Sequence, residues 1–250
     1  MRKLVLGAAN LISLGASAPA VAADLTPRAY APPAMVADIS NWSGFYIGIN
    51  GGGGWSHNCS TNTSLFGVPT VPSFDEGCNT ATGVLVGGQA GYRWQVSSFV
   101  FGLEAQGDWA NLTGSNASLF NLGTSNHTKT NSLGLFTGQV GYAWSNVLWY
   151  AKGGAALADN TYNGLFTGAA FDQATETRWG GVVGTGIEVG IDPCWSLALE
   201  YDHAFMGGQN LTFTAVPVAG VSRNDSISQG IDMITARINF RYGGPVVAKY

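Results

Sequence analysis

Apolar side chains alternate with small or polar ones in eight separate stretches of the chain. In the clearest stretch, residues 179–191, one parity is mostly tryptophan, valine and isoleucine, and the other is mostly glycine with the carboxylate of Glu188. Successive side chains of a β-strand point to opposite faces, so the two parities are two faces of a strand. The predicted strands cover residues 44–55, 83–95, 99–109, 133–144, 147–159, 179–191, 195–205 and 232–242.

The charged residues of these strands share a face with the glycines, and the other face is apolar. A soluble barrel would bury its apolar face and expose its charges, so this pattern indicates a sheet that closes on itself inside a lipid bilayer. Tryptophan and tyrosine lie near the strand ends, where rings meet the headgroup boundary, and we interpret them as two girdles rather than a carbohydrate-binding platform. The girdle residues are Trp42, Trp55, Tyr92, Trp94, Trp109, Tyr142, Trp144, Trp149, Trp179, Trp195 and Tyr242.

The connections between predicted strands alternate in length. Those after the second, fourth and sixth strands are short turns, and the others are polar stretches of roughly 19–27 residues. Short periplasmic turns and long outer loops are typical of outer-membrane barrels. We therefore predict an all-β fold, an eight-stranded antiparallel up-and-down transmembrane β-barrel. Eight strands leave an interior that side chains just fill, which argues against a wide general porin.

Composition agrees with this fold. Charged residues are only 10% of the chain, and there are 36 glycines among 250 residues. No stretch after the N-terminus is an unbroken apolar run of about 20 residues, so we expect no transmembrane helix. The net charge of −4 and the lack of a basic patch argue against a nucleic-acid partner.

The N-terminus has the pattern of an export signal. Arg2 and Lys3 precede an apolar core at residues 4–14, and Ala20-Val21-Ala22 fits a cleavage site. The apolar core is too short for a membrane anchor, so we predict cleavage after Ala22 or Ala23.

The domain boundaries follow from this signal and from the strand pattern. We predict a signal peptide at residues 1–22, a flexible periplasmic linker at 23–41, the barrel at 42–242 and a C-terminal tail at 243–250. The linker contains three prolines and shows no periodicity, which is why we expect it to be flexible.

The chain has three cysteines. Cys59 and Cys78 lie in one polar segment, and export to an oxidising compartment favours a disulfide between them. The alternative is two unpaired thiols in a loop. Cys194 would be left over as a free thiol in a short turn.

The inward face of the predicted barrel collects four bases and five acids. Isolated buried charges are very costly, so these groups must form an ion-pair network or line trapped water. We predict a central network of Glu104, Glu188 and Glu200 with Lys152 and Arg237, and we interpret it as a structural polar core rather than as a gate for small solutes. The complete inward set is Arg93, Glu104, Asp108, Lys152, Glu188, Glu200, Asp202, Arg237 and Arg241, with Gln89, Gln106 and Gln139. We expect Arg93 and Arg241 near the periplasmic end, and Asp108 and Asp202 near the outer end.

Several motifs in these strands resemble a known family. They are Trp42–Gly48 (WSGFYIG), Gly138–Trp144 (GQVGYAW), Trp149–Ala155 (WYAKGGA), Gly184–Glu188 (GTGIE) and Trp195–Tyr201 (WSLALEY). Together they resemble the small outer-membrane β-barrel proteins, the OmpA-transmembrane-like porin family of surface antigens of Gram-negative bacteria. The resemblance covers residues 42–242 and implies an eight-stranded barrel in the cell outer membrane, a role in envelope integrity and weak pore activity.

The resemblance also implies partners. These are outer-membrane lipid and lipopolysaccharide and the outer-membrane assembly machinery, and a monomeric state is left open. The family often ends its last strand at an aromatic residue that the machinery reads. In this chain Phe240, Tyr242 and Tyr250 all stay open for that role.

We weigh three functions: a structural surface barrel with at most slow passive permeation, a small-solute or ion pore, and an outer-membrane lipid-modifying enzyme, with an adhesin role also open. The best site for an enzyme is Asp202-His203, but neighbouring strand residues face opposite sides and cannot orient one another. His57 and His127 have no ligand spacing. We therefore favour the structural barrel and expect no catalytic residue, metal or cofactor.

Overall fold

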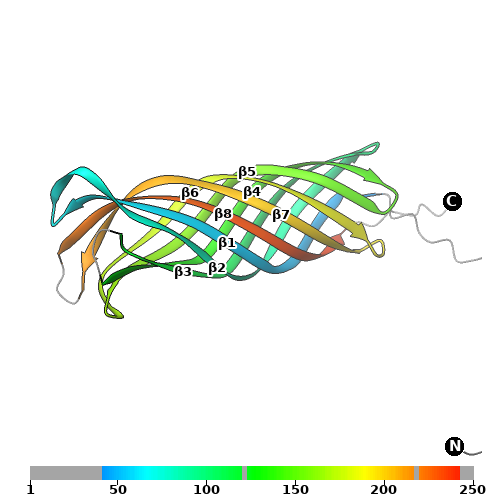
Figure 1. Cartoon of the computed structure of the whole chain (residues 1–250). Coiled ribbons are helices and arrows are strands. Elements are labelled where there is room, and N and C mark those ends of the chain that lie inside the picture. Colours follow the sequence, from blue (N-terminus) through cyan, green and yellow to red (C-terminus); the bar gives the residue numbers. More distant parts are fainter. Residues whose placement is uncertain (1–40, 120–122, 217–219, 243–250) are drawn as a thin grey trace, which may run out of the picture. The chain divides into compact units, whose positions relative to one another are not determined.

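The computed structural model describes residues 41–119, 123–216 and 220–242. These form eight antiparallel strands, each paired with its neighbours in sequence, and the last strand pairs with the first to close a barrel (Figure 1). The strands are β1 (Gly44–Leu65), β2 (Val68–Val96), β3 (Phe99–Ala117), β4 (Thr124–Trp144), β5 (Val147–Phe166), β6 (Ala169–Gly190), β7 (Trp195–Ala215) and β8 (Val221–Tyr242). The predicted fold class is therefore confirmed.

Three predicted segments lie outside this description. They are the signal peptide, the linker apart from its last residue, and the C-terminal tail. In the described residues, no helix is long and apolar enough to cross a membrane.

The prediction of four long loops is wrong, because the strands continue through most of those segments. β1 has 22 residues and β2 has 29, and only Phe66 and Gly67 separate them. The strands run on as hairpins at one end of the barrel (Figure 1). Outside a bilayer, a strand needs no apolar face to hold its backbone ladder, so the alternation stops while the pairing goes on.

The two faces of each strand are placed as the alternation predicts. Large apolar side chains point out of the barrel, among them Ile49, Leu103 and Trp109, which are 66%, 61% and 77% exposed. Glycine is required on the inner face, where strands cross closely. A Cβ atom on Gly52 would lie 1.9 Å from the carbonyl oxygen of Ile234 on β8. The barrel is thus lined by small and polar groups and coated by apolar ones, the arrangement of a protein in lipid.

The predicted girdle residues lie in two outward bands, with one exception. Trp149 and Trp195 mark the band near the short turns, and Trp55 and Trp109 mark the band towards the long hairpins. Trp42 is not a girdle residue, because it is 1% exposed and lies inside the barrel. The guanidinium carbon of Arg241 lies 4.5 Å from the centroid of its ring. Trp42 shares the parity of the inward Tyr46, and its position near a strand end led to the girdle interpretation.

The structure contains the predicted disulfide between Cys59 and Cys78. The two residues are directly opposite each other in the β1–β2 ladder, with their Cα atoms 4.1 Å apart. Cys194 is free and lies in the turn between β6 and β7. The bridge therefore joins the two strands of one long hairpin, beyond the tryptophan band that lies towards the long hairpins.

These placements predict the thiol chemistry of the mature protein. Alkylation of the unfolded, non-reduced chain should add one label, at Cys194, because the other two sulfurs are bonded to each other. Reduction before alkylation should raise the count to three labels. Mass spectrometry reads both numbers, and three labels without reduction would contradict the disulfide.

Candidate functional site

The charged groups in the barrel interior meet around Lys152, on β5. Its Nζ atom lies 2.6 Å from Oε1 of Glu200, 3.2 Å from Oδ1 of Asp202 and 3.6 Å from Oε1 of Glu104. These four side chains are at most 1% exposed. One ammonium group therefore holds three carboxylates that reach it from strands β3 and β7.

Arg237, on β8, pairs with two of these carboxylates. Its guanidinium forms a 2.8 Å ion pair with Oε1 of Glu104 and a second, very short ion pair with Glu200. The hydroxyls of Tyr46 and Tyr150 donate 2.6 Å hydrogen bonds to Glu104 and Glu200 respectively. We call Glu104, Lys152, Glu200, Asp202 and Arg237 the central network. Each glutamate thus has cationic and hydroxyl partners, which offset the cost of its burial.

Glu188 does not belong to this network, contrary to the sequence-based prediction. It forms a separate 2.8 Å ion pair with Arg93, and the hydroxyl of Ser196 also donates to it. The Nε atom of Arg93 donates to Gln139 at 3.2 Å. Register explains the difference: Glu188 is opposite Leu148 on β5, four residues nearer the short turns than Lys152. The alternation predicted the face on which Glu188 lies, but not its position along the barrel axis.

The remaining inward charges have polar partners. Asp108 accepts a 2.8 Å hydrogen bond from Gln106, and Gln89 bonds Asn50 and Asn239. Arg241 lies at the short-turn end and donates to the backbone carbonyls of Asn41 and Asp192.

An apolar layer fills the lumen beyond the central network, towards the long hairpins. On β8, Met233 is four residues beyond Arg237, and on β2, Leu85 is four residues beyond Gln89. All members of this layer are at most 8% exposed. They are Ala81, Leu85, Ala110, Leu112, Leu133, Leu135, Ala156, Ala158, Val182, Ala204, Met206, Ile231 and Met233. The sequence did signal this layer, since Leu133 and Leu135 share the parity of Gln139, but the inward charges drew the interpretation to a polar core alone.

A second charged group closes the lumen near the hairpin tips. Arg223 of β8 contacts Asp172 at 3.1 Å, Asp225 at 3.4 Å and Glu76 at 3.7 Å. We call these four residues the mouth cluster. Burial raises the pKa of Asp172 and that of Asp225 above the usual range of aspartate. Sequence reasoning missed the cluster, because it assigned all four residues to loops.

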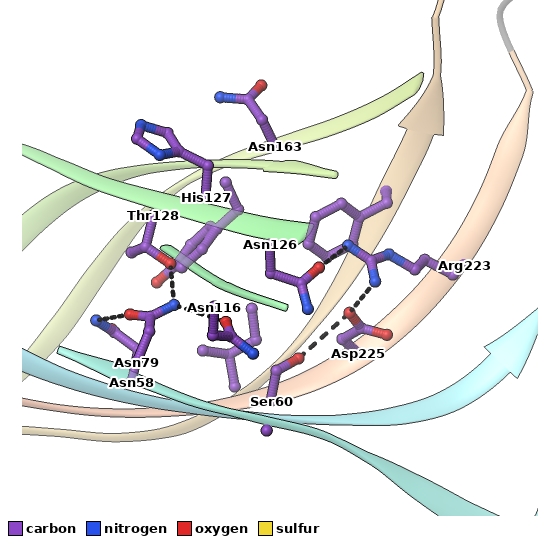
Figure 2. Close-up of a pocket in the computed structure, with 14 residues that line it drawn as sticks. Asn58, Ser60, Asn79, Asn116, Asn126, His127, Thr128, Asn163, Arg223 and Asp225 are labelled. Atoms are coloured by element: carbon purple, nitrogen blue, oxygen red, sulfur yellow. Dashed lines mark hydrogen bonds and ion pairs between the residues drawn. The ribbon is translucent and has the colours of Figure 1, made fainter. Parts of the chain in front are cut away.

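A small polar cavity adjoins the mouth cluster (Figure 2). Its volume is about 20 Å³, which is room for about one water molecule. Asn79 bridges the cavity by donating to Asn116 at 3.2 Å and to Thr128 at 3.1 Å. Arg223 donates to Asn126 at 2.9 Å (Figure 2). The amide side chains around the cavity form hydrogen bonds with their neighbours, and these bonds stiffen the mouth of the barrel. In the described part of the chain, no cluster of His, Cys, Asp and Glu could hold a metal ion.

The structure separates Asp202 from His203, as strand parity requires. Asp202 points inward to Lys152, whereas Nδ1 of His203 lies 2.6 Å from Oδ1 of Asp232 on the outer wall. The hydroxyl of Tyr201 donates to the same carboxylate oxygen at 2.6 Å. Sequence reasoning missed this outward group, because Tyr201 and His203 lie on one predicted strand and Asp232 on another, and parity does not show which residues of two strands are opposite.

A closed ring of strands, an apolar exterior with two aromatic bands and a packed charged interior define an outer-membrane β-barrel protein. The chain belongs to the outer membrane protein beta-barrel domain family, whose model matches residues 8–223. It is therefore a protein of the cell outer membrane. By the usual orientation of such barrels, the short turns are periplasmic and the long hairpins extracellular.

Two curated relatives match nearly the whole chain. They are the 31 kDa outer-membrane immunogenic proteins of Brucella melitensis biotype 1 and Brucella suis biovar 1. Each is 28% identical over 251 residues, which is 97% of this chain and 99% of the relative. Among solved structures, the outer membrane protein OprG from Pseudomonas aeruginosa is similar in fold, with a TM-score of 0.51 and 12% identity over 82% of this chain and 100% of that one.

The central network predicts a strong effect of removing Lys152. In a Lys152→Met variant, three buried carboxylates lose a shared cation, so the free energy of unfolding should fall by about 3–5 kcal/mol. Lys129→Met, which removes a lysine that the structure does not place in an ion pair, should change it by less than about 0.5 kcal/mol. Urea unfolding in lipid vesicles measures both, and equal midpoints for the two variants would contradict the assigned role.

The mouth cluster predicts a stability that falls as pH rises. Because the pKa values of Asp172 and Asp225 are raised, the folded mouth keeps protons that the unfolded chain has released. The hairpins should therefore gain stability that is fully present when the pH is below the ordinary pKa of aspartate. They should lose it as the pH rises through the raised pKa values of these two residues. Hydrogen exchange of the extracellular parts of β6 and β8, corrected for intrinsic rates, should show more protection at about pH 4.5 than at about pH 7.5. An Asp172→Asn/Asp225→Asn variant should lose the difference, and greater protection at the higher pH would refute it.

Proposed function

We propose that this protein is a structural barrel of the outer membrane that displays stiff extracellular hairpins and permits at most slow passive permeation. The observation that carries this proposal is that three packed layers of side chains lie one after another along the lumen. The central network, the apolar layer and the mouth cluster follow one another, and each is built from residues of several strands.

The apolar layer supports a closed lumen most directly. An ion that crossed it would leave water without gaining a polar partner, which costs far more than thermal energy. Polar groups of the central network would also have to leave their partners to admit a solute. With side chains at most 8% exposed, the layer is packed as a core and not as a channel lining.

The exterior supports a structural role in the envelope. The outward apolar band suits acyl chains of outer-membrane lipid and lipopolysaccharide, and β8 offers Phe240 and Tyr242 to the assembly machinery. The barrel closes without an open edge, which is compatible with a monomer. The relatives from Brucella are named as immunogenic, which agrees with surface display. No enzymatic step is part of this proposal.

Planar bilayer recording distinguishes the structural barrel from a pore. The wild-type protein should give no sustained single-channel current. A Leu112→Ser/Leu135→Ser/Met233→Ser variant should give at most brief, small openings, since hydroxyls at these positions would let water through the apolar layer while the central network and the mouth cluster still lie across the path. Lys152→Met and Glu188→Gln should not create a conductance, because the apolar layer stays in place.

The alternative, a small-solute or ion pore, predicts the opposite pattern. A steady wild-type conductance that changes when Lys152 or Glu188 loses its charge would make the interior charges a gate and would refute the structural proposal. Folding of each variant is checked by its heat-modifiable migration in detergent gels.

A further inference from the structure

The outer wall of the barrel has an apolar groove that crosses strands β6, β7, β8 and β1. At its centre, the outward residues Ile187, Leu199, Ala236 and Gly51 are directly opposite one another in three successive ladders. The two large side chains are 44% and 56% exposed, and the small residues beside them leave a hollow of about 590 Å³. A concave, apolar surface of this size is typical of a ligand site.

The groove continues towards the long hairpins as a second hollow of about 380 Å³. The two hollows share Ile187 and Leu199, and the second is also lined by Tyr201 and Ile234. From Leu199 to His203 the strand β7 runs four residues, which is about 13 Å. One leaflet of the hydrocarbon core is about 15 Å thick. An acyl chain that lies in the groove therefore places its headgroup at the level of His203.

A polar group stands at this end of the groove, at the level of the aromatic band towards the long hairpins. The hydroxyl of Tyr201 and Nδ1 of His203 each lie 2.6 Å from Oδ1 of Asp232, and Asp232 is opposite Trp55 in the β1–β8 ladder. A carboxylate only accepts hydrogen bonds, so Nδ1 donates, and Nε2 of the neutral imidazole is an acceptor. The side chains of His203 and Asp232 are 29% and 11% exposed. This group therefore presents a negative charge and hydrogen-bond acceptors to the lipid.

The charges of the outer wall select the headgroup. Among the described residues, every lysine and arginine except Lys129 is buried in the barrel, and Lys129 lies on β4, which is not a strand of the groove. An anionic headgroup would meet the carboxylate of Asp232 with no lysine or arginine beside it. A primary ammonium group supplies one positive charge and three N–H donors, which suit a carboxylate and an imidazole acceptor.

We propose that one phosphatidylethanolamine molecule binds in this groove, with an acyl chain over Gly51 and Ala236 and its ammonium group at Asp232 and His203. A lipid is the occupant that the position favours, because the groove lies within the apolar band of the barrel, which faces acyl chains. The inference rests on the proposed role as a structural barrel in the envelope. Its test measures bound lipid and not conductance, so either proposal can fail without the other.

Selective lipid retention tests this proposal. The folded protein is equilibrated at pH 8 with vesicles of equal parts phosphatidylethanolamine, phosphatidylcholine and phosphatidylglycerol, then extracted and washed in detergent. Mass spectrometry measures the lipids that stay bound. The wild type should keep phosphatidylethanolamine in at least about threefold excess over each of the others, which is the effect of one net hydrogen bond. Phosphatidylcholine has no N–H donor, and phosphatidylglycerol has no cationic group.

Two variants separate the groove from its polar end. Gly51→Leu/Ala236→Leu fills the central hollow and should lower the retained phosphatidylethanolamine at least about tenfold, since it displaces several buried methylene groups. The backbone accepts the first change, because a Cβ atom on Gly51 would have no contact nearer than 3.8 Å. Asp232→Asn removes the charge and should lower the retained phosphatidylethanolamine to the level of the other two lipids.

The matched control is Ala105→Leu/Gly107→Leu, which adds the same side chains to the outer wall on β3, outside the groove. It should retain lipid as the wild type does, and heat-modifiable gel migration confirms that all variants are folded. Equal retention of the three lipids by the wild type overturns the proposal. Undiminished retention of phosphatidylethanolamine by the groove-filling variant, or an unchanged preference in Asp232→Asn, also overturns it.

Discussion

A charge inside a narrow barrel must find its partner within the barrel. Eight strands leave little room for water, so each inward carboxylate needs a cation or hydrogen-bond donor from another side chain of the interior. Lys152 and Arg237 meet this requirement for Glu104, Glu200 and Asp202, and Arg93 meets it for Glu188. Because the partners sit on different strands, the register of the strands around the ring decides which charges meet.

The same register decides which side chains lie beyond the network, towards the long hairpins. With the charged side chains in place, the next inward positions of β2, β3, β4 and β8 converge, and these positions carry Leu, Ile and Met. The lumen therefore alternates between polar and apolar layers along its axis. The apolar layer excludes water from the network on its outer side, which strengthens the ion pairs below it. A barrel built in this way gains rigidity from the same packing that closes it.

The extracellular half obeys different rules. Its strands stand in water, so their outer faces need no apolar coat and their polar side chains are free to bond one another. Stability there comes from the backbone ladder, from the Cys59–Cys78 bridge and from the amides and ion pairs around Arg223. The barrel thus carries stiff hairpins well beyond the bilayer, and their uncharged tips are presented by a scaffold instead of by loose loops.

The sequence predicted the membrane half well, because lipid imposes a period of two on every strand that crosses it. That period identified which face of each strand holds Glu104, Lys152 or Glu188, and the short turns set the topology. The period of two could not predict how far along the barrel axis each charge lies, since the pairing of Glu188 with Arg93 depends on the register between strands. The period also could not predict the parts of the strands that extend beyond the bilayer, because no alternation marks a strand there. The residues of the mouth cluster, Glu76, Asp172, Arg223 and Asp225, were therefore treated as loop residues. Trp42 was misplaced because its position near a strand end was given more weight than its parity, which is that of the inward Tyr46.

The dryness of the apolar layer is the central claim, and hydroxyl-radical labelling of Met206 and Met233 tests it most directly. Methionine sulfur oxidises readily when water carries radicals to it. In the folded protein in lipid nanodiscs, both residues should stay unmodified under a dose that oxidises them fully after heat unfolding. Oxidation of Met233 in the folded barrel at a rate near that of the unfolded chain would mean that water fills the lumen, and the account of a sealed, packed interior would be wrong.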